Sequence, residues 1–410
     1  FIQAQSFVEN MPGCRLHCRI TDQQLHQVEV ESVEITADTA IDFCFPEWVR
    51  YRGVRYAVVS AQGGLFKNND KMKSLTTGTN MQYLGSHICF GCKNLQWISI
   101  GTGLKGIGCA AFSLCYQLDS LDYNAISCKL DQSSFDIWLG CYNLRKLHLG
   151  NQVEYIYENF LCHCSGLDCE LHLPASIRHI GSNAFEDCSS IKGTLVLPPN
   201  LETVGTYTFA GFNSVDTLII QSRMLKVPNS EHRVFYHSIN PVDVIFDSQV
   251  VALPAFIFAR FWGLRSIQIP NHIDIIPAQM CVYDTNLLYI KLPDSLRLIG
   301  LCSFYNSGLK SIEIPNKTFM IHNYAFAYCY NLTEAIIGEG TRFIGDYCFV
   351  EDTALRSLKV LSPEPPRVFE HTFSEMDLEC ITLQVPLVAI EEYRRHPIWG
   401  RFPHIIALPQ

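Results

Sequence analysis

The sequence has few charged residues and no long apolar run. Charged side chains make up 17% of its 410 residues and apolar ones 48%, so the chain has enough apolar surface to offset its entropy and is not predominantly disordered. No stretch approaches 18 consecutive apolar residues, so we predict no transmembrane helix. Because the chain begins at Phe1 rather than Met, we expect that a signal peptide has been removed.

Basic clusters and catalytic signatures are also missing. The formal net charge is −9 and no basic run exceeds the pair Arg394-Arg395. Nucleic acid is therefore not an expected partner, since phosphate neutralisation supplies most of the affinity for it. The sequence contains no Gly-x-Ser-x-Gly, His-Glu-x-x-His, P-loop or strand-linked Rossmann glycine pattern. Carboxylate pairs such as Glu351-Asp352 fall where we expect exposed turns. We predict no enzyme, no catalytic residues and no cofactor.

One phrase recurs along the chain. It reads Ile-Gly, three residues, an aromatic residue, two more, often Cys, then Leu-x-x-Ile-x-Ile, often closed by Pro; the cleanest copy runs from Ile180 to Pro198. We call the aromatic slot the aromatic position, and successive copies of it lie 22 to 26 residues apart. The fourteen aromatic positions are Phe66, Cys89, Phe112, Trp138, Leu161, Phe185, Phe209, Phe235, Phe258, Cys281, Phe304, Phe326, Phe349 and Phe373. Spacing this regular identifies a repeat protein.

Each part of the phrase predicts a local structure. Leu-x-x-Ile-x-Ile ends in period-two alternation, which is typical of a short strand with one buried face. The glycine after Ile is expected to adopt a left-handed or tight-turn conformation. The stretch Ala-Phe-x-x-Cys-x-x-Leu has spacings of three, which favour a helical or 3-10 turn. Because one repeat cannot bury its own apolar face, the repeats must stack into a solenoid of parallel strands.

The ends of the repeat array depart from this pattern and predict caps. We expect a lead-in and a β-rich N-terminal cap over 1–58, with 1–12 loose and strands at Cys14–Ile20, Val28–Ile35, Ile41–Val49 and Arg55–Val59. The solenoid is expected over 59–386. A C-terminal cap over 387–410 is expected to contain a short helix at Leu387–Arg395, with Tyr393, Trp399 and Phe402 covering the last repeat. The predicted fold class is therefore an α+β repeat protein, a solenoid of about 14 repeats with helical turns.

The motif Ile-Gly-x-x-Ala-Phe-x-x-Cys-x-x-Leu-x-x-Ile-x-Ile-Pro resembles the BspA-type leucine-rich repeats of bacterial surface and secreted proteins. The longer variant at 188–193 and the closing segment from Val385 to Phe402 resemble the same family, and the likeness covers roughly residues 14–405. The resemblance implies a leucine-rich-repeat solenoid outside the cytoplasm with an adhesion or ligand-binding role, and no catalytic residues.

The repeat removes most of the disulfide or metal signal that eighteen cysteines would otherwise give. Six of them share the position three residues after the aromatic position, which we call the thiol position, where a free Cys behaves as a small apolar residue; they are Cys92, Cys115, Cys141, Cys164, Cys188 and Cys329. Cys14 and Cys18 are expected in a core. The densest group, Cys162, His163, Cys164 and Cys169, leaves three alternatives: buried thiols, one disulfide, or a zinc site.

The central x of each Leu-x-x-Ile-x-Ile strand is expected to face away from the core, and we call it the outer position. Val196, Ile219 and Ile245 occupy it in three successive repeats and predict a small apolar contact stripe. The alternative is that β-branched residues simply suit strands, or that a loop from the insertions before Trp138 and Phe235 covers them. Further along, Lys291 and Glu313 predict a cross-strand charge pair.

Asp122, His148 and His172 occupy the outer position just before that stripe. Two imidazoles beside a carboxylate can bind a metal or respond to pH, whereas the alternative is three solvated side chains. We predict no metal here.

Together these features predict a non-enzymatic binding module, secreted or at the cell surface. It would recognise a protein or glycan outside the cell through Asp122, His148, His172, Val196, Ile219 and Ile245. The alternatives are a structural spacer of a surface protein or, less in keeping with the sequence, a metal-dependent enzyme or metal-binding site. The sequence leaves the oligomeric state open.

Overall fold

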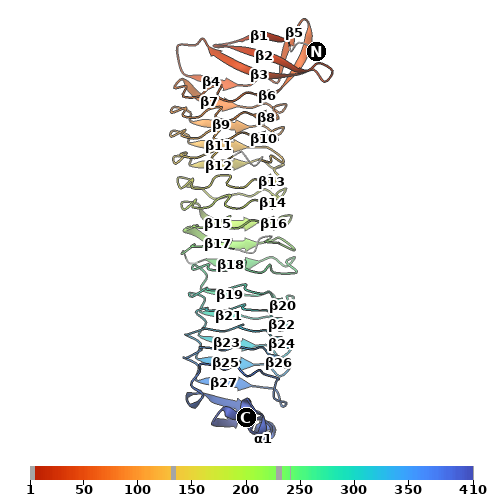
Figure 1. The fold of residues 1–410 in the computed structure, drawn as a ribbon, viewed down its shortest axis with the longest axis vertical. Coiled ribbons are helices and arrows are strands. Elements are labelled where there is room, and N and C mark those ends of the chain that lie inside the picture. Colours follow the sequence, from red (N-terminus) through yellow and green to blue (C-terminus); the bar gives the residue numbers. More distant parts are fainter. Residues whose placement is uncertain (1–4, 131–134, 228–232, 241, 410) are drawn as a thin grey trace. The chain divides into compact units, whose positions relative to one another are not determined.

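The computed structural model describes residues 5–130, 135–227, 233–240 and 242–409. These form two compact units, the N-terminal unit (1–193 with 212–214) and the C-terminal unit (194–211 with 215–410). Each unit is a β-solenoid in which every repeat adds strands parallel to those of its neighbours (Figure 1). The solenoid of short parallel strands is confirmed. The proposed boundaries at residues 58 and 386 stay a prediction.

The N-terminal unit begins with a β-rich cap. Its strands are β1 (Ser6–Met11), β2 (Cys14–Asp22), β3 (Gln27–Ile35), β4 (Ile41–Cys44), β5 (Trp48–Tyr51) and β6 (Val54–Ala61). The expectation of a loose lead-in over 1–12 was wrong for Ser6–Met11, because β1 pairs antiparallel with β2 over its whole length, and residues 1–4 lie outside the described residues. The expected strand Ile41–Val49 is in fact β4 and β5, which pair with different strands, β7 and β6. The chain bends between them at Pro46, which has no N–H to donate to a sheet.

Two series of parallel strands follow in this unit. The longer series is β7 (Met72–Thr76), β9 (Trp97–Ile100), β11 (Ser120–Tyr123) and β12 (Lys146–Leu149), and the shorter series is β8 (Tyr83–Leu84), β10 (Gly106–Ile107), β13 (Tyr155–Ile156) and β14 (His179–Ile180). The longer strands pair in register, with Asp122 beside both Ser99 and His148. Outer positions of successive repeats therefore lie side by side, as period-two alternation predicts.

The C-terminal unit continues the same arrangement. Its longer strands are most of β15 (Lys192–Leu197) and β17 (Ser214–Ile220), then β18 (Asp243–Phe246), β19 (Ser266–Gln268), β21 (Tyr289–Lys291), β23 (Ser311–Ile314), β25 (Glu334–Ile337), β27 (Ser357–Val360), β28 (Thr382–Val385) and β29 (His404–Ala407). Its shorter strands are β16 (Thr203–Val204), β20 (Ile275–Ile276), β22 (Leu298–Ile299), β24 (Met320–Ile321) and β26 (Phe343–Ile344).

The expected helical turns are not helices. In all fourteen repeats the residue two after the aromatic position has a positive φ, between 52° and 85°, and a left-handed residue interrupts a right-handed helix. The backbone instead bonds between repeats: Phe304 N–H donates to Ala325 at 2.8 Å, and Phe326 N–H to Cys348 at 3.0 Å. Spacings of three therefore reflected a compact turn rather than a helix.

The glycine after Ile has a different role from the one expected. None of Gly85, Gly108, Gly181, Gly300 and Gly345 has a φ in the left-handed range. A Cβ at Gly108 would lie 2.3 Å from the backbone nitrogen of Ser86, and one at Gly345 would lie 2.3 Å from that of Asn323. Glycine is required there because the backbones of adjacent repeats approach too closely for any side chain.

The aromatic positions form a ladder of stacked rings in the core. Phe304, Phe326, Phe349 and Phe373 stack with centroids 5.4, 5.6 and 5.9 Å apart and planes within 13° of parallel. Thiol positions form a second ladder, in which several side chains donate to the carbonyl at the preceding aromatic position; Cys188 donates to Leu161 at 3.2 Å. The side chains that donate in the same way are those of Cys92, Cys115, Cys141, Ser238 and Cys329. A thiol at this position is therefore a donor as well as a small apolar group.

The C-terminal cap covers the end of this ring ladder, as predicted. Helices in the described residues are 3-10 turns η1 (Leu378–Cys380), η2 (Leu387–Ala389) and η3 (Trp399–Arg401) and one α-helix, α1 (Ile390–Arg395). The ring centroids of Trp399 and Phe402 each lie 5.1 Å from that of Phe373. Tyr393 Oη donates to Ser362 and Trp399 Nε1 donates to Pro366, so both buried polar groups have partners. Within the described residues, no helix has the length and apolar character that crossing a membrane requires.

Candidate functional site

Asp122, His148 and His172 do not form one cluster. Asp122 and His148 are register neighbours on β11 and β12, with His148 Nδ1 3.9 Å from Asp122 Oδ1. His172 lies on the next repeat, where the backbone forms no strand, and its Nε2 is 3.8 Å from Glu170 instead. The imidazoles of His148 and His172 are exposed. Among the residues that the structure describes, no group of three or more His, Cys, Asp or Glu side chains is placed to hold a metal ion.

The three residues of the proposed stripe belong to the C-terminal unit. Val196, Ile219 and Ile245 lie on β15, β17 and β18, neighbouring strands of one sheet, and Ile219 pairs with Ile245. Ile245 is half exposed, whereas Val196 and Ile219 are half-buried. Residues 131–134 and 228–232 of the insertions lie outside the described residues, so the covering loop remains untested.

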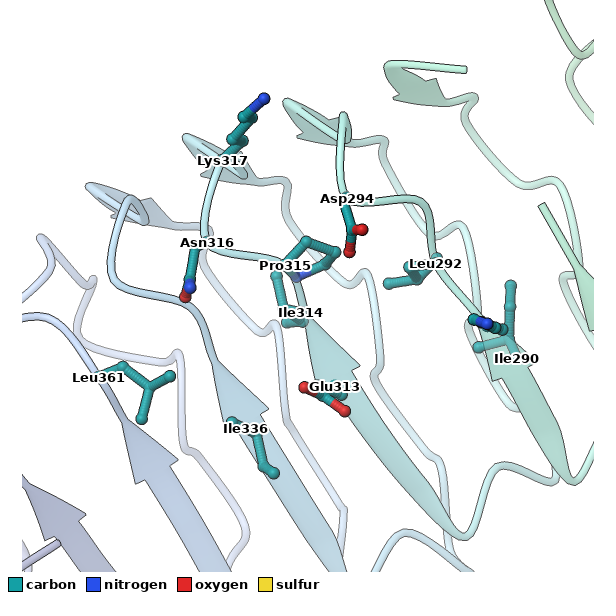
Figure 2. A pocket seen from close by; sticks show the side chains of 11 residues that line it. Ile290, Leu292, Asp294, Glu313, Ile314, Pro315, Asn316, Lys317, Ile336 and Leu361 are labelled. Carbon is teal, nitrogen blue, oxygen red and sulfur yellow. The ribbon is translucent and has the colours of Figure 1, made fainter. Parts of the chain in front are cut away.

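The outer positions of later strands border a hollow that the sequence did not indicate (Figure 2). The hollow has a volume of about 560 Å³ and lies where β21, β23 and β25 end. Lys291, Glu313 and Ile336 project from these strands, and Asp294, Asn316 and Lys317 come from the turns that follow. Leu292 and Ile314, both buried, and the half-buried Leu361 give it an apolar base.

Four charged side chains surround this hollow, and none of them is in an ion pair among the described residues. Within the described residues, no ion pair joins Lys291 to Glu313, so the predicted cross-strand pair was wrong; one does form at 2.7 Å between Lys359 and Glu334. Asp294 and Lys317 are exposed as well, and neither forms an ion pair with any other residue that the structure describes. The Asn316 Oδ1 accepts the Glu339 N–H at 3.1 Å, which leaves its amide N–H groups for a ligand.

The cysteine cluster is a set of thiols. All eighteen cysteines lie in the part of the chain that the structure describes, and each is free. Cys162 Sγ lies 3.7 Å from Glu186 Oε2, whereas His163 is directed to Asp187, 3.0 Å away. Cys14 and Cys18 are buried, as expected. Of the alternatives for this cluster, separate thiols fit the geometry.

Two aspartates occupy thiol positions in the C-terminal unit. Asp284 and Asp352 are 0% and 1% exposed, so the expectation that Asp352 lies at an exposed turn was wrong. Asp284 Oδ1 accepts the Phe261 N–H and Asp352 Oδ1 accepts the Cys329 N–H, each at 2.7 Å. Within the described part of the chain, their Oδ2 atoms have no hydrogen-bond partner. Burial raises the pKa of both carboxyls well above the usual 3.8, because the charged form is costly away from water.

Comparisons with known proteins agree with this architecture. Residues 61–192, 189–287 and 275–394 match the BspA type leucine-rich repeat region, in six copies. A leucine-rich repeat protein from Bacteroides ovatus is similar in fold, at 18% identity and a TM-score of 0.54, over 94% of this chain and 99% of that one.

Two further solved structures are similar. The pneumococcal vaccine antigen PcpA matches at 14% identity and a TM-score of 0.46, over all of both chains. A leucine-rich cell surface protein from Faecalibacterium prausnitzii matches at 16% identity and a TM-score of 0.30, over 86% of this chain and 94% of that one. No functionally curated protein matches by sequence. With the repeat profile matched over more than half of its length, the chain belongs to the BspA-type leucine-rich-repeat family.

Proposed function

We propose that this protein is a non-enzymatic binding module, secreted or at the cell surface, which recognises a protein or glycan through the outer strand face of the C-terminal unit. The observation that carries the proposal is the hollow beside β21, β23 and β25. Unpaired charged groups can orient a ligand while the apolar base buries its apolar surface, and ligand-binding sites combine these two features. Membership of a family of non-enzymatic repeat scaffolds supports binding rather than catalysis.

The stripe on β15, β17 and β18 enlarges the same face. An exposed Ile245 costs solubility without stabilising the core, so a partner that covers it is favoured by apolar burial. The BspA-type repeat supports the proposed location outside the cytoplasm, because its resemblance implies a bacterial surface or secreted protein. Asp122, His148 and His172 are kept as a secondary contact site in the N-terminal unit.

The test is a binding screen of the full chain against immobilised extracellular-matrix proteins and a glycan array. Each partner found is then measured with Ile245→Asp and with Lys291→Glu/Lys317→Glu. Matched controls in the same unit are Val251→Asp and Arg223→Glu, which change exposed residues away from the outer positions. We expect about a tenfold or greater loss of affinity in the test variants and little change in the controls, since buried anchors carry most binding energy.

Two results would contradict the proposal. Unchanged affinity in every strand-face variant would place binding elsewhere on the molecule. A screen without any partner above background would favour the structural spacer instead.

A further inference from the structure

A second candidate site lies in the N-terminal cap, on the hairpin of β5 and β6. The turn is Arg52-Gly53, with φ of 50° and 81°, and it sets Arg50 directly opposite Arg55. Because side chains alternate along a strand, Trp48 and Arg50 share a face with Arg55. The Arg55 guanidinium lies 4.6 Å from the centre of the Trp48 ring. Two guanidiniums and an indole therefore meet on one side of a short hairpin.

The two arginines have no acidic partner. All three side chains are exposed, and within the residues that the structure describes neither Arg50 nor Arg55 is in an ion pair. The preceding carboxylate, Glu47, accepts hydrogen bonds from the backbone of Thr79 at 2.7 Å and of Asn80 at 3.2 Å. Like charges directly opposite on paired strands are unfavourable, so folding does not account for this arrangement.

Trp48 also borders a hollow of about 330 Å³. Side-chain amides of Gln27, Asn80 and Gln82 line it, together with Leu25 and Lys105. Lys105 Nζ donates a hydrogen bond to Gln82 Oε1 at 3.0 Å. Lys105 therefore adds a third positive charge to those of Arg50 and Arg55. Gln27 lacks a side-chain partner in the described structure, and the amide N–H groups of Gln82 stay available because only its oxygen is engaged.

We infer that this surface of the cap binds an acidic carbohydrate; the surface consists of Arg50 and Arg55 on the hairpin and the adjoining hollow that Trp48 and Lys105 line. Guanidinium groups hold carboxylate or sulfate through charge-assisted hydrogen bonds. The indole offers an apolar ring with a polar tip, which suits the C–H face of a sugar, and the amides match sugar hydroxyls. This site is separate from the strand face, and the inference does not rest on it.

An acidic carbohydrate fits better than other polyanions. Nucleic acid and anionic membranes are bound by extended basic surfaces, whereas this chain carries a net charge of −9 and gathers only three cations here. The amide-lined hollow would be unused by a phosphate backbone or a lipid headgroup layer. Uronates and sulfated sugars share the required chemistry, and the test separates them.

The experiment measures binding of the full chain to four probes by isothermal calorimetry. They are an oligogalacturonate, a heparin oligosaccharide, a neutral dextran of similar size and a single-stranded oligonucleotide. We expect binding to the uronate, the sulfated sugar or both, weakened by added salt, and none to dextran. Losing both guanidiniums in Arg50→Gln/Arg55→Gln should weaken binding about tenfold or more, since hydrogen bonds to charged groups are strong.

Controls separate a site from general charge. Arg145→Gln removes one exposed arginine elsewhere in the same unit, and it should leave the affinity unchanged. Trp48→Ala should weaken binding, and circular dichroism of each variant checks that the cap remains folded. Ile245→Asp should have no effect, which keeps this test independent of the strand face. The inference would be overturned if dextran bound as tightly as the acidic sugars, if only the oligonucleotide bound, or if no probe bound. An equal loss of affinity in Arg145→Gln would overturn it too.

Discussion

The buried aspartates make the stability of the C-terminal unit depend on pH in an unusual direction. Asp284 and Asp352 have raised pKa values in the folded protein because burial disfavours the carboxylate. Between the usual value of 3.8 and the raised one, the folded state holds one more proton per group than the unfolded state. The contribution of these groups to the free energy of unfolding is therefore fully present below that usual value, and it is lost as the pH rises toward the folded pKa.

The size of this effect follows from proton linkage. Each group lowers the free energy of unfolding by about 1.4 kcal/mol per pH unit in that window. Asp284→Asn keeps an oxygen for the Phe261 N–H and removes the titration. Relative to the wild type, we expect this variant to gain stability as the pH rises above 3.8, by about 1.4 kcal/mol per pH unit until the folded pKa is reached, and the double variant with Asp352→Asn to gain about twice as much.

Urea denaturation followed by circular dichroism at several pH values measures the difference. Asp274→Asn, at an exposed site in the same unit, is the matched control, and its difference from the wild type should not grow with pH. Infrared spectra add an independent readout, since above pH 3.8 the wild type should keep a protonated-carboxyl band that the double variant lacks. Parallel stability curves for wild type and Asp284→Asn, or no such band, would refute the reasoning.

Three further predictions concern the repeat itself. Gly345→Ala should destabilise the protein more than Gly53→Ala, because the new Cβ would lie 2.3 Å from the Asn323 nitrogen. At Gly53 a Cβ meets open space, so that substitution costs only the strain of a left-handed φ, about 1–2 kcal/mol. Urea denaturation midpoints of the two variants compare these costs. Cys115→Ser should be less destabilising than Cys115→Val, because serine can still donate a hydrogen bond to the Cys89 carbonyl and valine cannot. Equal losses of stability in the two variants would count against that hydrogen bond. Trp399→Ala should cost about 3–5 kcal/mol and expose amides near Phe373 to hydrogen exchange, and unchanged protection there would contradict its capping role.

The sequence determined the repeat and its register. A period of 22 to 26 residues placed every aromatic position, and two-residue alternation placed the outer positions. These features were predictable because each repeat binds mainly its neighbours, so one local pattern fixes the same contacts again and again. Of the candidate site, the pairing of Ile219 with Ile245 and of Asp122 with His148 followed from this register.

The tertiary structure decided what lies between repeats. The positive φ two residues after each aromatic position replaced the expected helical turns, since backbone hydrogen bonds to the next repeat outweigh the preference of a single segment. Close backbone approach, and not a left-handed conformation, explains Gly108 and Gly345. Neither feature is visible in a segment read alone.

Charge compensation likewise depended on the folded chain. Sequence spacing brought Lys291 and Glu313 together on adjacent strands, yet the structure leaves both unpaired beside a hollow. The opposed Arg50 and Arg55 arise from the pairing of β5 with β6 across the turn at Arg52-Gly53. The sequence repeat predicts the core because a residue's position in the repeat decides whether it is buried. The partners of a flexible charged side chain depend instead on every surface that folding brings near it.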